Sequence, residues 1–518
     1  MSAADCIDQS EPGWVARVTL SPPCLQDNSA DADRLCRAVR RELGVAHCHV
    51  DLDLLKRLPG VLRDGNYAAR CVMFRDGDVG VLVHAVSDGD GATLAGLAVD
   101  LGTTRVVMRL VDLDQRRVLA ETAFDNPQVA IGPDILARIH HTEQPGGLDH
   151  LQGLIVGGIN RHLSEMCHTC GLSVDNVHLV TVAGNTAMGH LLAGLPVRWM
   201  IREPYIPAAN RFNLIPAAQL GLATHATARV MLFPSVGSYF GGDLVAGILF
   251  TGLHQSADTA LLVDVGTNAE VVLGNREWLI ACAGAAGPAL EGGMSRMGTT
   301  AGPGVIDRVR IDSSTLAFDL HTIEDQTPRG ICGSGVIDLA AQLYLAGMID
   351  IRGKLRPDVC RQRLETVDGM AHLTIVPADG SATGQPLRIS QADLDSLIRS
   401  KAAMYAILET ITGEMGLAPE ALQTFYVAGT FGSFIDPRSA ITIGMLPDLP
   451  LARFQSMGNT SLGGATMALI SREAVSSVDA IRDSITYMEL NVNQAFMNRF
   501  SAAKFIPHTD TGRFPSVA

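Results

Sequence analysis

A repeated pair of glycine-containing motifs constrains the fold of this chain more than any other feature of its sequence. The run Leu97-Ala-Val-Asp100-Leu-Gly102-Thr103-Thr104 matches Leu261-Leu-Val-Asp264-Val-Gly266-Thr267-Asn268, with Asp, Gly and Thr at the same offsets. Each run is followed later in the chain by Val-Ala-Gly, at residues 182–184 and again at 427–429. Self-similarity of this kind indicates a duplicated structural unit. We therefore expect two related half-domains that face each other across a cleft.

The pattern around these motifs predicts an α/β protein. Short apolar β runs alternate with amphipathic helical patterns from residue 97 onward, which is typical of layered α/β folds,. Residues 14–86 show a separate pattern with a strand at 14–20, a helix at 31–43 and a hairpin around 75–78,. Further along the chain we expect helices at 148–170, 333–346 and 391–415. The expected organisation is a tail (1–13), a small α/β domain with its linker (14–92), a first half (93–255) and a second half (256–518).

Composition excludes several classes of protein. Of the 518 residues, 47% are hydrophobic and 18% are charged, so the chain is neither disordered nor collagen-like,. A net charge of −14 and the lack of a basic patch argue against nucleic acid as a partner,. No 18-residue apolar run is uninterrupted and no secretory signal pattern opens the chain, so we expect a cytoplasmic protein without a membrane span,.

The Asp-x-Gly-Thr hairpins are the strongest candidates for a functional site. An apolar strand delivers Asp100 to the end of a sheet, and Gly102 permits a tight turn whose backbone N–H groups can point at an anion,. Thr103 and Thr104 add hydroxyl donors, and Asp100 can face a Mg ion or an attacking water,. The second copy supplies the matching residues, so two hairpins would hold the β- and γ-phosphates of a nucleotide from both sides. Its residues are Asp264, Gly266, Thr267 and Asn268.

The common lysine-dependent phosphate loop is absent. The single Gly-Lys pair, Gly353-Lys354, is followed by leucine, whereas a Walker A loop requires serine or threonine there,. The chain has only four lysines. Phosphate charge must therefore be met mainly by backbone amides, Mg and arginine.

Three other glycine-rich turns are weaker candidates, and each has a purely structural alternative. The turn at 426–433 is expected to be the adenosine-binding edge through Gly429, Thr430, Phe431 and Gly432, or else a plain strand-to-helix turn. Asp243, after Gly241-Gly242, either orients a hydrolytic water or caps a helix,. Gly333-Ser334 opens a helix whose N-terminus suits an anion, although a helix start alone explains much of this pattern,.

The cysteines do not indicate a metal centre. Cys167 and Cys170 lie one helical turn apart, but no second pair completes a four-ligand zinc site,. Cys48 alternates with His47 and His49 in a strand-like run, so its side chain points away from both,. The ten scattered cysteines match no iron–sulfur spacing, and we expect no such cluster,.

In combination, the motifs resemble those of the acetate and sugar kinase/Hsp70/actin (ASKHA) superfamily. The similarity is carried by the order Asp100-Leu-Gly-Thr-Thr, Ala183-Gly184-Asn185-Thr186, Asp264-Val-Gly-Thr-Asn-Ala-Glu270 and Ala428-Gly-Thr-Phe-Gly432. Within the superfamily the chain is most similar to the reductive activators of corrinoid proteins, over about residues 95 to 508. Further segments that carry the similarity are Glu203-Pro-Tyr205, Gly241-Gly-Asp243, Cys282-Ala-Gly-Ala-Ala-Gly-Pro288 and Glu489-Leu-Asn491. Residues 14–86 resemble that family's middle domain.

The resemblance implies duplicated ribonuclease-H-like halves around a nucleotide cleft, with Asp100, Asp264 and Asp243 as catalytic residues. Asp100 and Asp264 would also hold Mg, and Gly184, Asn185 and Glu270 would join the hairpin residues in binding ATP. The implied activity is ATP hydrolysis coupled to reduction of a corrinoid protein from Co(II) to Co(I). A partner that binds the reduced state tenfold better raises a one-electron potential by about 59 mV.

Departures from the resemblance leave the partners open. Such activators typically carry an iron–sulfur domain, which this sequence lacks, so we expect a separate electron-donor protein alongside the corrinoid protein. Two alternatives remain: a small-molecule kinase of the same fold with Asp243 as catalytic residue, and a non-catalytic actin-like or chaperone-like nucleotide switch. The sequence does not decide whether the chain forms a homodimer.

Overall fold

The computed structural model describes residues 12–266, 268–285, 297–299, 301–429, 435–490 and 494–517. The chain divides into two compact units, each built from separated stretches of sequence. The first contains Met1–Phe250 and Thr460–Asp483, and the second contains Thr251–Asn459 and Ser484–Ala518.

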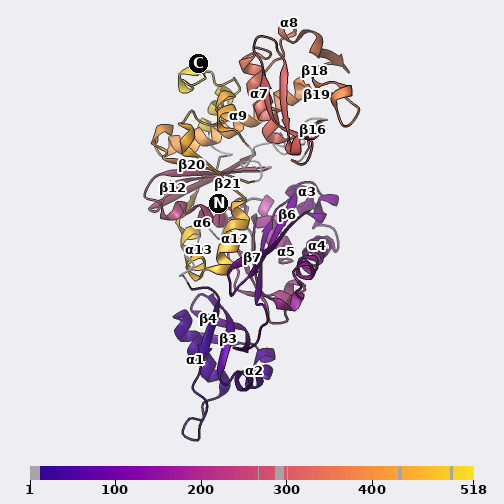
Figure 1. Ribbon diagram of the computed structural model, residues 1–518. Helices are drawn as coiled ribbons and strands as arrows, with labels where there is room; N and C mark the ends of the chain where they lie inside the picture. Colours follow the sequence, from indigo (N-terminus) through magenta and orange to yellow (C-terminus); the bar gives the residue numbers. More distant parts are fainter. Residues whose placement is uncertain are drawn as a thin grey trace. The chain divides into compact units, whose positions relative to one another are not determined.

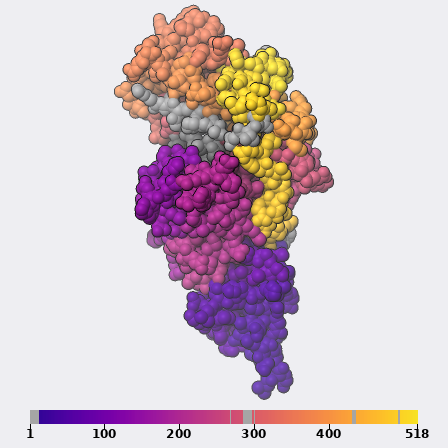
Figure 2. All heavy atoms as spheres, turned by 180° about the vertical axis from the view of Figure 1, so that it is seen from behind, coloured from indigo at the N-terminus to yellow at the C-terminus, as the bar shows by residue number. Residues whose placement is uncertain are grey.

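The first unit begins with a small α/β subdomain, the indigo lobe of that unit in Figure 2. Its four-stranded sheet has the order β1-β3-β4-β2, and two helices bury leucine and valine side chains in its core. The predicted helix at 31–43 and the predicted hairpin around 75–78 are both confirmed. The elements are β1 (Val15–Thr19), α1 (Asp31–Leu43), β2 (His47–Val50), α2 (Leu52–Asp64), β3 (Ala68–Asp76) and β4 (Val79–Ser87).

A six-stranded sheet forms the centre of the first unit (Figure 1). Its order is β7-β6-β5-β8-β10-β9, in which β5, β6 and β7 are antiparallel and β8 and β10 continue parallel to β5. The strands are β5 (Ala95–Leu101), β6 (Arg105–Asp112), β7 (Arg117–Asp125), β8 (Val177–Gly184), β9 (Ile215–Pro216) and β10 (Arg229–Leu232).

Alternate residues of β5 serve the two faces of this sheet. Leu97, Val99 and Leu101 enter a core with α4 (Gly147–Thr169) and α5 (Thr186–Leu192). The intervening residues face α12 (Thr460–Ile470), which packs on β5, β6 and β8 (Figure 1). A Cβ on Gly96 would lie 2.8 Å from Leu113 Cδ2 and 3.0 Å from Leu469 Cδ2, so glycine lets these leucines pack closely on the strand,.

A second close contact joins α12 to α6 (Gly242–Thr251). A Cβ on Gly464 would lie 2.1 Å from the Ala246 carbonyl oxygen, and one on Gly463 would lie 2.5 Å from the Phe250 ring. Small residues on α12 therefore let the two helix backbones approach each other. In this way a segment from late in the sequence becomes part of the first unit.

The second unit contains a six-stranded sheet in which five strands repeat the topology of the first, whereas the sixth strand lies at the opposite edge. Its order is β21-β20-β11-β12-β13-β22, in which β11, β12 and β13 are antiparallel and β20 and β21 continue parallel to β11. The duplication predicted from sequence is therefore confirmed as a repeated topology of five strands. The strands are β11 (Ala260–Val265), β12 (Asn268–Asn275), β13 (Trp278–Ala285), β20 (Thr424–Ala428), β21 (Phe454–Gly458) and β22 (Ile485–Tyr487).

Two three-stranded sheets and several helices complete the described part of the second unit. The predicted helices at 333–346 and 391–415 are confirmed as α7 and α9, and the one at 148–170 as α4 of the first unit. The added strands are β14 (Val305–Ile311), β15 (Phe318–Thr322), β16 (Gly330–Ile331), β17 (Leu364–Val367), β18 (Met370–Val376) and β19 (Leu387–Ser390). The helices are α7 (Gly333–Leu345), α8 (Pro357–Cys360), α9 (Gln391–Glu414), α11 (Pro437–Thr442) and α14 (Gln494–Ala502).

The first unit also contains α3 (Ile135–His141), and α13 (Arg472–Ser484) follows α12. Over the residues that the structure describes, no helix is both long enough and apolar enough to cross a membrane.

Candidate nucleotide-binding site

Asp100 and Asp264 occupy the same register position in the two repeated sheets. Asp100 on β5 lies opposite Ala183 of the parallel strand β8, and Asp264 on β11 lies opposite Ala428 of the parallel strand β20. In each sheet the Asp therefore lies beside the alanine of the Ala-Gly pair at the end of the parallel neighbouring strand. The two sequence motifs that repeat together also meet in space within each unit.

The turn after Asp100 is held by hydrogen bonds to its carbonyl groups. A Cβ on Gly102 would lie 2.3 Å from the Arg105 carbonyl oxygen, so the turn requires glycine,. Asn126 donates from Nδ2 to the Gly102 carbonyl at 2.9 Å, and its own N–H donates to the Thr104 carbonyl at 2.8 Å. With the carbonyls engaged from behind, the geometry of the turn is fixed before any ligand binds.

Arg138, on α3, supports the same turn and was not predicted from sequence. It is fully buried, and its Nη2 donates to the Thr103 carbonyl at 2.6 Å. Its other nitrogens bond to the Gly132 carbonyl, at 3.0 Å, and to Gln128 Oε1, at 3.1 Å. Burial lowers the pKa of Arg138 to about 10, so the guanidinium stays charged at neutral pH. A buried positive charge behind the turn favours an anion in front of it.

Asn185 links the turn to the end of β8. Its Nδ2 donates to Thr103 Oγ1 at 3.0 Å, and its Oδ1 accepts from the Met188 N–H at 2.9 Å as the N-cap of α5. Thr186 Oγ1 lies 2.9 and 3.1 Å from the carbonyl oxygens of Gly237 and Phe240. The loop that leads into α6 is thereby fixed against the end of β8.

Gly241 brings Asp243 to these residues. A Cβ on Gly241 would lie 2.3 Å from Asn185 Cα, 2.5 Å from Asp243 Oδ1 and 2.7 Å from the Gly184 carbonyl oxygen. Asp243 lies in the first turn of α6, where its Oδ1 accepts from the Leu244 N–H at 2.9 Å. The described geometry thus gathers the predicted residues of the first unit at the carboxyl ends of β5 and β8: Asp100, Gly102, Thr103, Gly184, Asn185 and Asp243.

Ser461 is a second residue that the sequence argument missed. Its hydroxyl, on α12, donates to Asp100 Oδ1 at 2.8 Å, which orients the carboxylate. No local pattern pointed to it, because the contact arises only where α12 packs on β5, β6 and β8. Thr104, by contrast, is exposed at the edge of the turn.

The second unit places two carboxylates beside each other. Asp264 on β11 lies directly opposite Glu270 on β12 in the antiparallel pair, so both side chains project from one face,. The residue opposite Asp100 in the first unit is Val107. The two hairpins are therefore unequal, and only the second presents a carboxylate pair.

Gly429 packs its backbone against Asp264. Its φ of +83° lies in the left-handed region, and a Cβ there would lie 2.8 Å from Asp264 Oδ1,. Gly266 follows β11 as predicted and is half-buried. Four predicted residues lie outside the described residues, namely Thr267, Thr430, Phe431 and Gly432, and Asn268 is described only as backbone in β12.

Gly333 and Ser334 open α7 as predicted, but both are buried. The Ser334 hydroxyl lies 3.1 Å from Cys332 Sγ, and a Cβ on Gly335 would lie 2.4 Å from the Ile306 carbonyl oxygen. These contacts pack the helix start against β14 and β16. They give a structural reason for the glycines that is independent of any ligand.

The donor set suits magnesium and a polyphosphate. Mg prefers oxygen ligands, usually one or two carboxylates together with phosphate oxygens and water. Asp100 with its serine partner supplies such oxygens in the first unit, and the Asp264–Glu270 pair supplies them separately in the second. The tight turns at Gly102 and Gly429 leave no room for a side chain, as expected where backbone approaches a ligand closely,.

The fold and these two hairpins define an ASKHA-type protein. Profiles of RACo, a reductive activator, match three consecutive parts of the chain: the linker region at 13–92, the middle region at 95–256 and the C-terminal ASKHA domain at 258–518. The chain belongs to the RACo family. The N-terminal subdomain matches the linker region, so the expected resemblance of residues 14–86 to the middle domain is wrong.

Named relatives agree with this assignment. A solved structure titled reductive activator for corrinoid,iron-sulfur protein is 37% identical, with a TM-score of 0.89 over 99% of this chain and 82% of that chain. The corrinoid activation enzyme RamQ of Eubacterium limosum is 28% identical over 78% of this chain and 69% of the relative. A [Co(II) methylated amine-specific corrinoid protein] reductase of Methanosarcina barkeri is 23% identical over 78% of this chain and 75% of the relative.

Proposed function

We propose that this chain is an ATPase that activates a corrinoid protein by assisting reduction of its cobalt from Co(II) to Co(I). The observation that carries the proposal is the shared register of Asp100 beside Ala183 and of Asp264 beside Ala428, in sheets that share a five-strand topology. Membership of the RACo family supports the choice of a corrinoid protein as partner.

In the proposed mechanism, each hairpin binds a different part of MgATP. The backbone N–H groups of the turn at 102–104 meet phosphate oxygens, with Arg138 as the buried charge behind them,. In the second unit Asp264 and Glu270 would hold Mg, which when bound neutralises charge on the transferred phosphoryl group,. Asp243, in the first turn of α6, orients the attacking water. The turn that begins at Gly429 would accept the adenosine.

Cobalt reduction requires a difference in affinity between two states of the partner. A protein that binds the Co(I) state of the corrinoid partner more tightly than the Co(II) state raises the potential of that couple, by about 59 mV for each factor of ten. Hydrolysis of ATP would then lower the affinity of the chain for the corrinoid partner and release that partner in its Co(I) state. The electrons come from a separate donor, because the ten cysteines match no iron–sulfur spacing,.

The decisive experiment measures ATP hydrolysis and Co(I) formation together. The purified chain is mixed with a Co(II) corrinoid protein, MgATP and a low-potential reductant, and Co(I) is followed by its visible absorbance. Asp100→Asn and Asp264→Asn should each lower ATP turnover by a factor on the order of a hundred, since positioning and electrostatic groups in phosphoryl transfer supply several kcal/mol. Asp53→Asn is the matched control, because this carboxylate lies exposed on α2. Parental turnover in both site variants would refute the two-hairpin site.

The choice of partner has its own test. Calorimetry compares binding of the Co(II) and methyl-Co(III) forms of the corrinoid protein. We expect the two forms to differ in affinity, because a ligand shifts an equilibrium only through differential binding. Equal affinity would refute the proposed dependence of partner binding on the state of the cobalt. It would not refute the assignment of the chain as an ATPase.

A further inference from the structure

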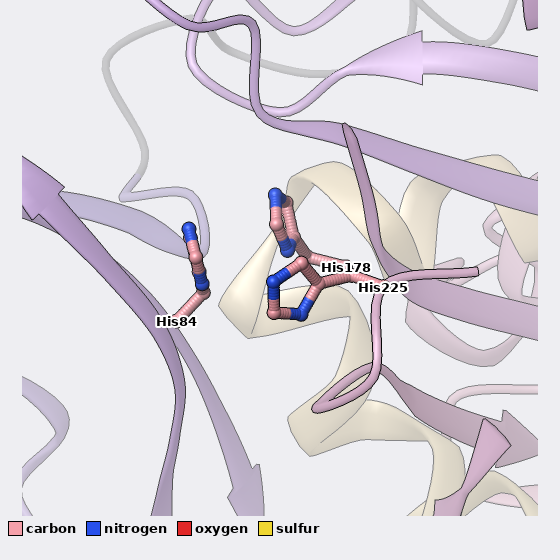
Figure 3. A group of neighbouring side chains, drawn as sticks. All are labelled: His84, His178 and His225. Carbon is pink, nitrogen blue, oxygen red and sulfur yellow. The ribbon is translucent and has the colours of Figure 1, made fainter. Parts of the chain in front are cut away.

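Three histidines from separate segments meet where the N-terminal subdomain contacts the central sheet of the first unit (Figure 3). His84 lies on β4 of the subdomain, and His178 is the second residue of β8. His225 precedes β10, and its N–H donates to the Val177 carbonyl at 3.1 Å. One nitrogen from each ring lies within 4.8 Å of the other two. The nucleotide-binding residues described above include none of them.

Two of the rings are buried with a polar atom that has no hydrogen-bond partner. His84 and His178 are 7% and 2% exposed, and in each the Nδ1 atom is buried and unpartnered. Each such atom destabilises the fold, because its hydrogen bond to water is lost without a replacement. A bound cation that accepts both lone pairs would remove this cost.

The third ring is oriented by a neighbour. His225 Nδ1 accepts from the Thr227 N–H at 3.1 Å in one tautomer and donates to Thr227 Oγ1 at 2.9 Å in the other, and the second tautomer leaves the Nε2 lone pair for an ion. The Thr227 hydroxyl donates to the Val83 carbonyl at 2.6 Å, directly beside His84. Metal-bound histidines are usually held through their other nitrogen in this manner. Thr227 thus connects His225 to the strand that carries His84.

The electrostatic surroundings select the kind of ion. Both rings lie away from water, and burial favours the neutral imidazole, which is the form that binds metals,. Arg57 is the charged neighbour that acts on all three rings, while Asp175 acts on His225 alone. A set of neutral nitrogens without a carboxylate suits zinc and similar transition metals, and not Mg or Ca.

We propose that His84, His178 and His225 form a binding site for one divalent transition-metal ion of the zinc class, with water at the fourth position. The His84 and His178 rings are now stacked, with centroids 4.2 Å apart and planes 16° apart, so their lone pairs do not converge. A tetrahedral zinc site, with bonds of about 2.0–2.1 Å, holds its nitrogens roughly 3.4 Å apart. Binding therefore requires the His84 ring to turn about its Cβ–Cγ bond. The bound ion would fasten the subdomain to the central sheet.

The test uses the untagged, chelator-treated full chain and calorimetric titration with Zn²⁺. We expect one ion per chain, and at least a tenfold loss of affinity in His84→Gln, His178→Gln and His225→Gln. Half-buried His141 and exposed His150 form a competing pair, with Nε2 and Nδ1 3.3 Å apart, so His150→Gln is the matched control. Affinity that is unchanged in the three cluster variants but lost in the control would overturn the proposal, as would the absence of stoichiometric binding.

A second measurement does not depend on variants that fold. X-ray absorption of the zinc-loaded parent chain counts imidazole ligands, and Co²⁺ substitution reports tetrahedral geometry through its visible d–d bands. Three imidazoles and a tetrahedral cobalt spectrum are expected. Two or fewer imidazoles would overturn the proposal.

Discussion

Replacing Gly241 with alanine tests whether the loop before α6 sets the geometry of the nucleotide site. A Cβ at this position would lie 2.3 Å from Asn185 Cα, whereas Cβ atoms in proteins essentially never lie closer than 3.0 Å to another heavy atom of this kind. It would also lie 2.5 Å from Asp243 Oδ1 and 2.7 Å from the Gly184 carbonyl oxygen. Two of these three atoms belong to the backbone and cannot move as a flexible side chain does. The steric overlap is therefore relieved only if the loop and the end of β8 separate by about 1 Å.

The size of the effect follows from this displacement. Overpacking of a closely packed site typically costs about 1–3 kcal/mol of stability. A shift of about 1 Å in a positioned group lowers the catalysed rate roughly a hundredfold. We therefore expect Gly241→Ala to lower both the thermal midpoint and the rate of ATP hydrolysis, with the larger effect on the rate.

The control is a glycine of the same unit that has free space around it. Gly157 is exposed in the middle of α4, and a Cβ there would meet nothing within 4 Å. Gly157→Ala should stabilise the chain by about 0.5–1 kcal/mol and leave hydrolysis unchanged, because alanine is the better helix former. Calorimetric unfolding and a phosphate-release assay compare the two variants. A Gly241→Ala variant with parental stability and turnover would refute the reasoning.

Three further predictions concern single side chains. Ser461→Ala removes the hydrogen bond to Asp100, so it should cost about 1 kcal/mol in chemical denaturation and reduce ATP turnover less than Asp100→Asn does,; an effect as large as that of Asp100→Asn would contradict an orienting role. Arg138→Met leaves the Thr103 carbonyl without its buried donor, so it should raise the KM for ATP and destabilise the chain by about 1–3 kcal/mol, and unchanged steady-state kinetics would argue against a supporting charge,. Lys401, fully buried on α9, donates to the carbonyls of Phe505 and Pro507, and burial lowers its pKa to about 7. Because the unfolded chain keeps this proton up to a pKa of about 10.4, stability should rise with pH between about 7 and 10, by up to about 1.36 kcal/mol per unit, and Lys401→Met should lose that slope in unfolding at pH 7 and 9.

The repeated topology was predictable because the residues that define each hairpin are close together in the sequence. An apolar strand, an Asp, a glycine turn and a returning strand form a unit whose elements are neighbours along the chain. The later Val-Ala-Gly segments could be paired with them because parallel strands place their carboxyl ends at one sheet edge. That argument located Asp100, Asp264 and the glycines that approach them.

The supporting residues could not be predicted because tertiary packing brings them in from distant segments. Arg138 reaches the turn from a helix whose own sequence shows no functional pattern. Ser461 contacts Asp100 only because α12 packs on the first unit, a contact that no local periodicity indicates. The histidine cluster has the same origin, since His84, His178 and His225 lie in three segments that have no motif in common.

The place of α12 in the first unit has a consequence for synthesis of the chain. Ser461 follows Asp100 by 361 residues, and a ribosome that adds roughly 5–20 residues per second needs about 20–70 s to cover that interval,. Throughout this time the face of β5 that carries Gly96 lacks the helix that covers it. During synthesis the first unit therefore exposes an apolar sheet face to solvent until α12 has been made. Chaperones bind surfaces of this kind, and such surfaces promote aggregation when translation stalls.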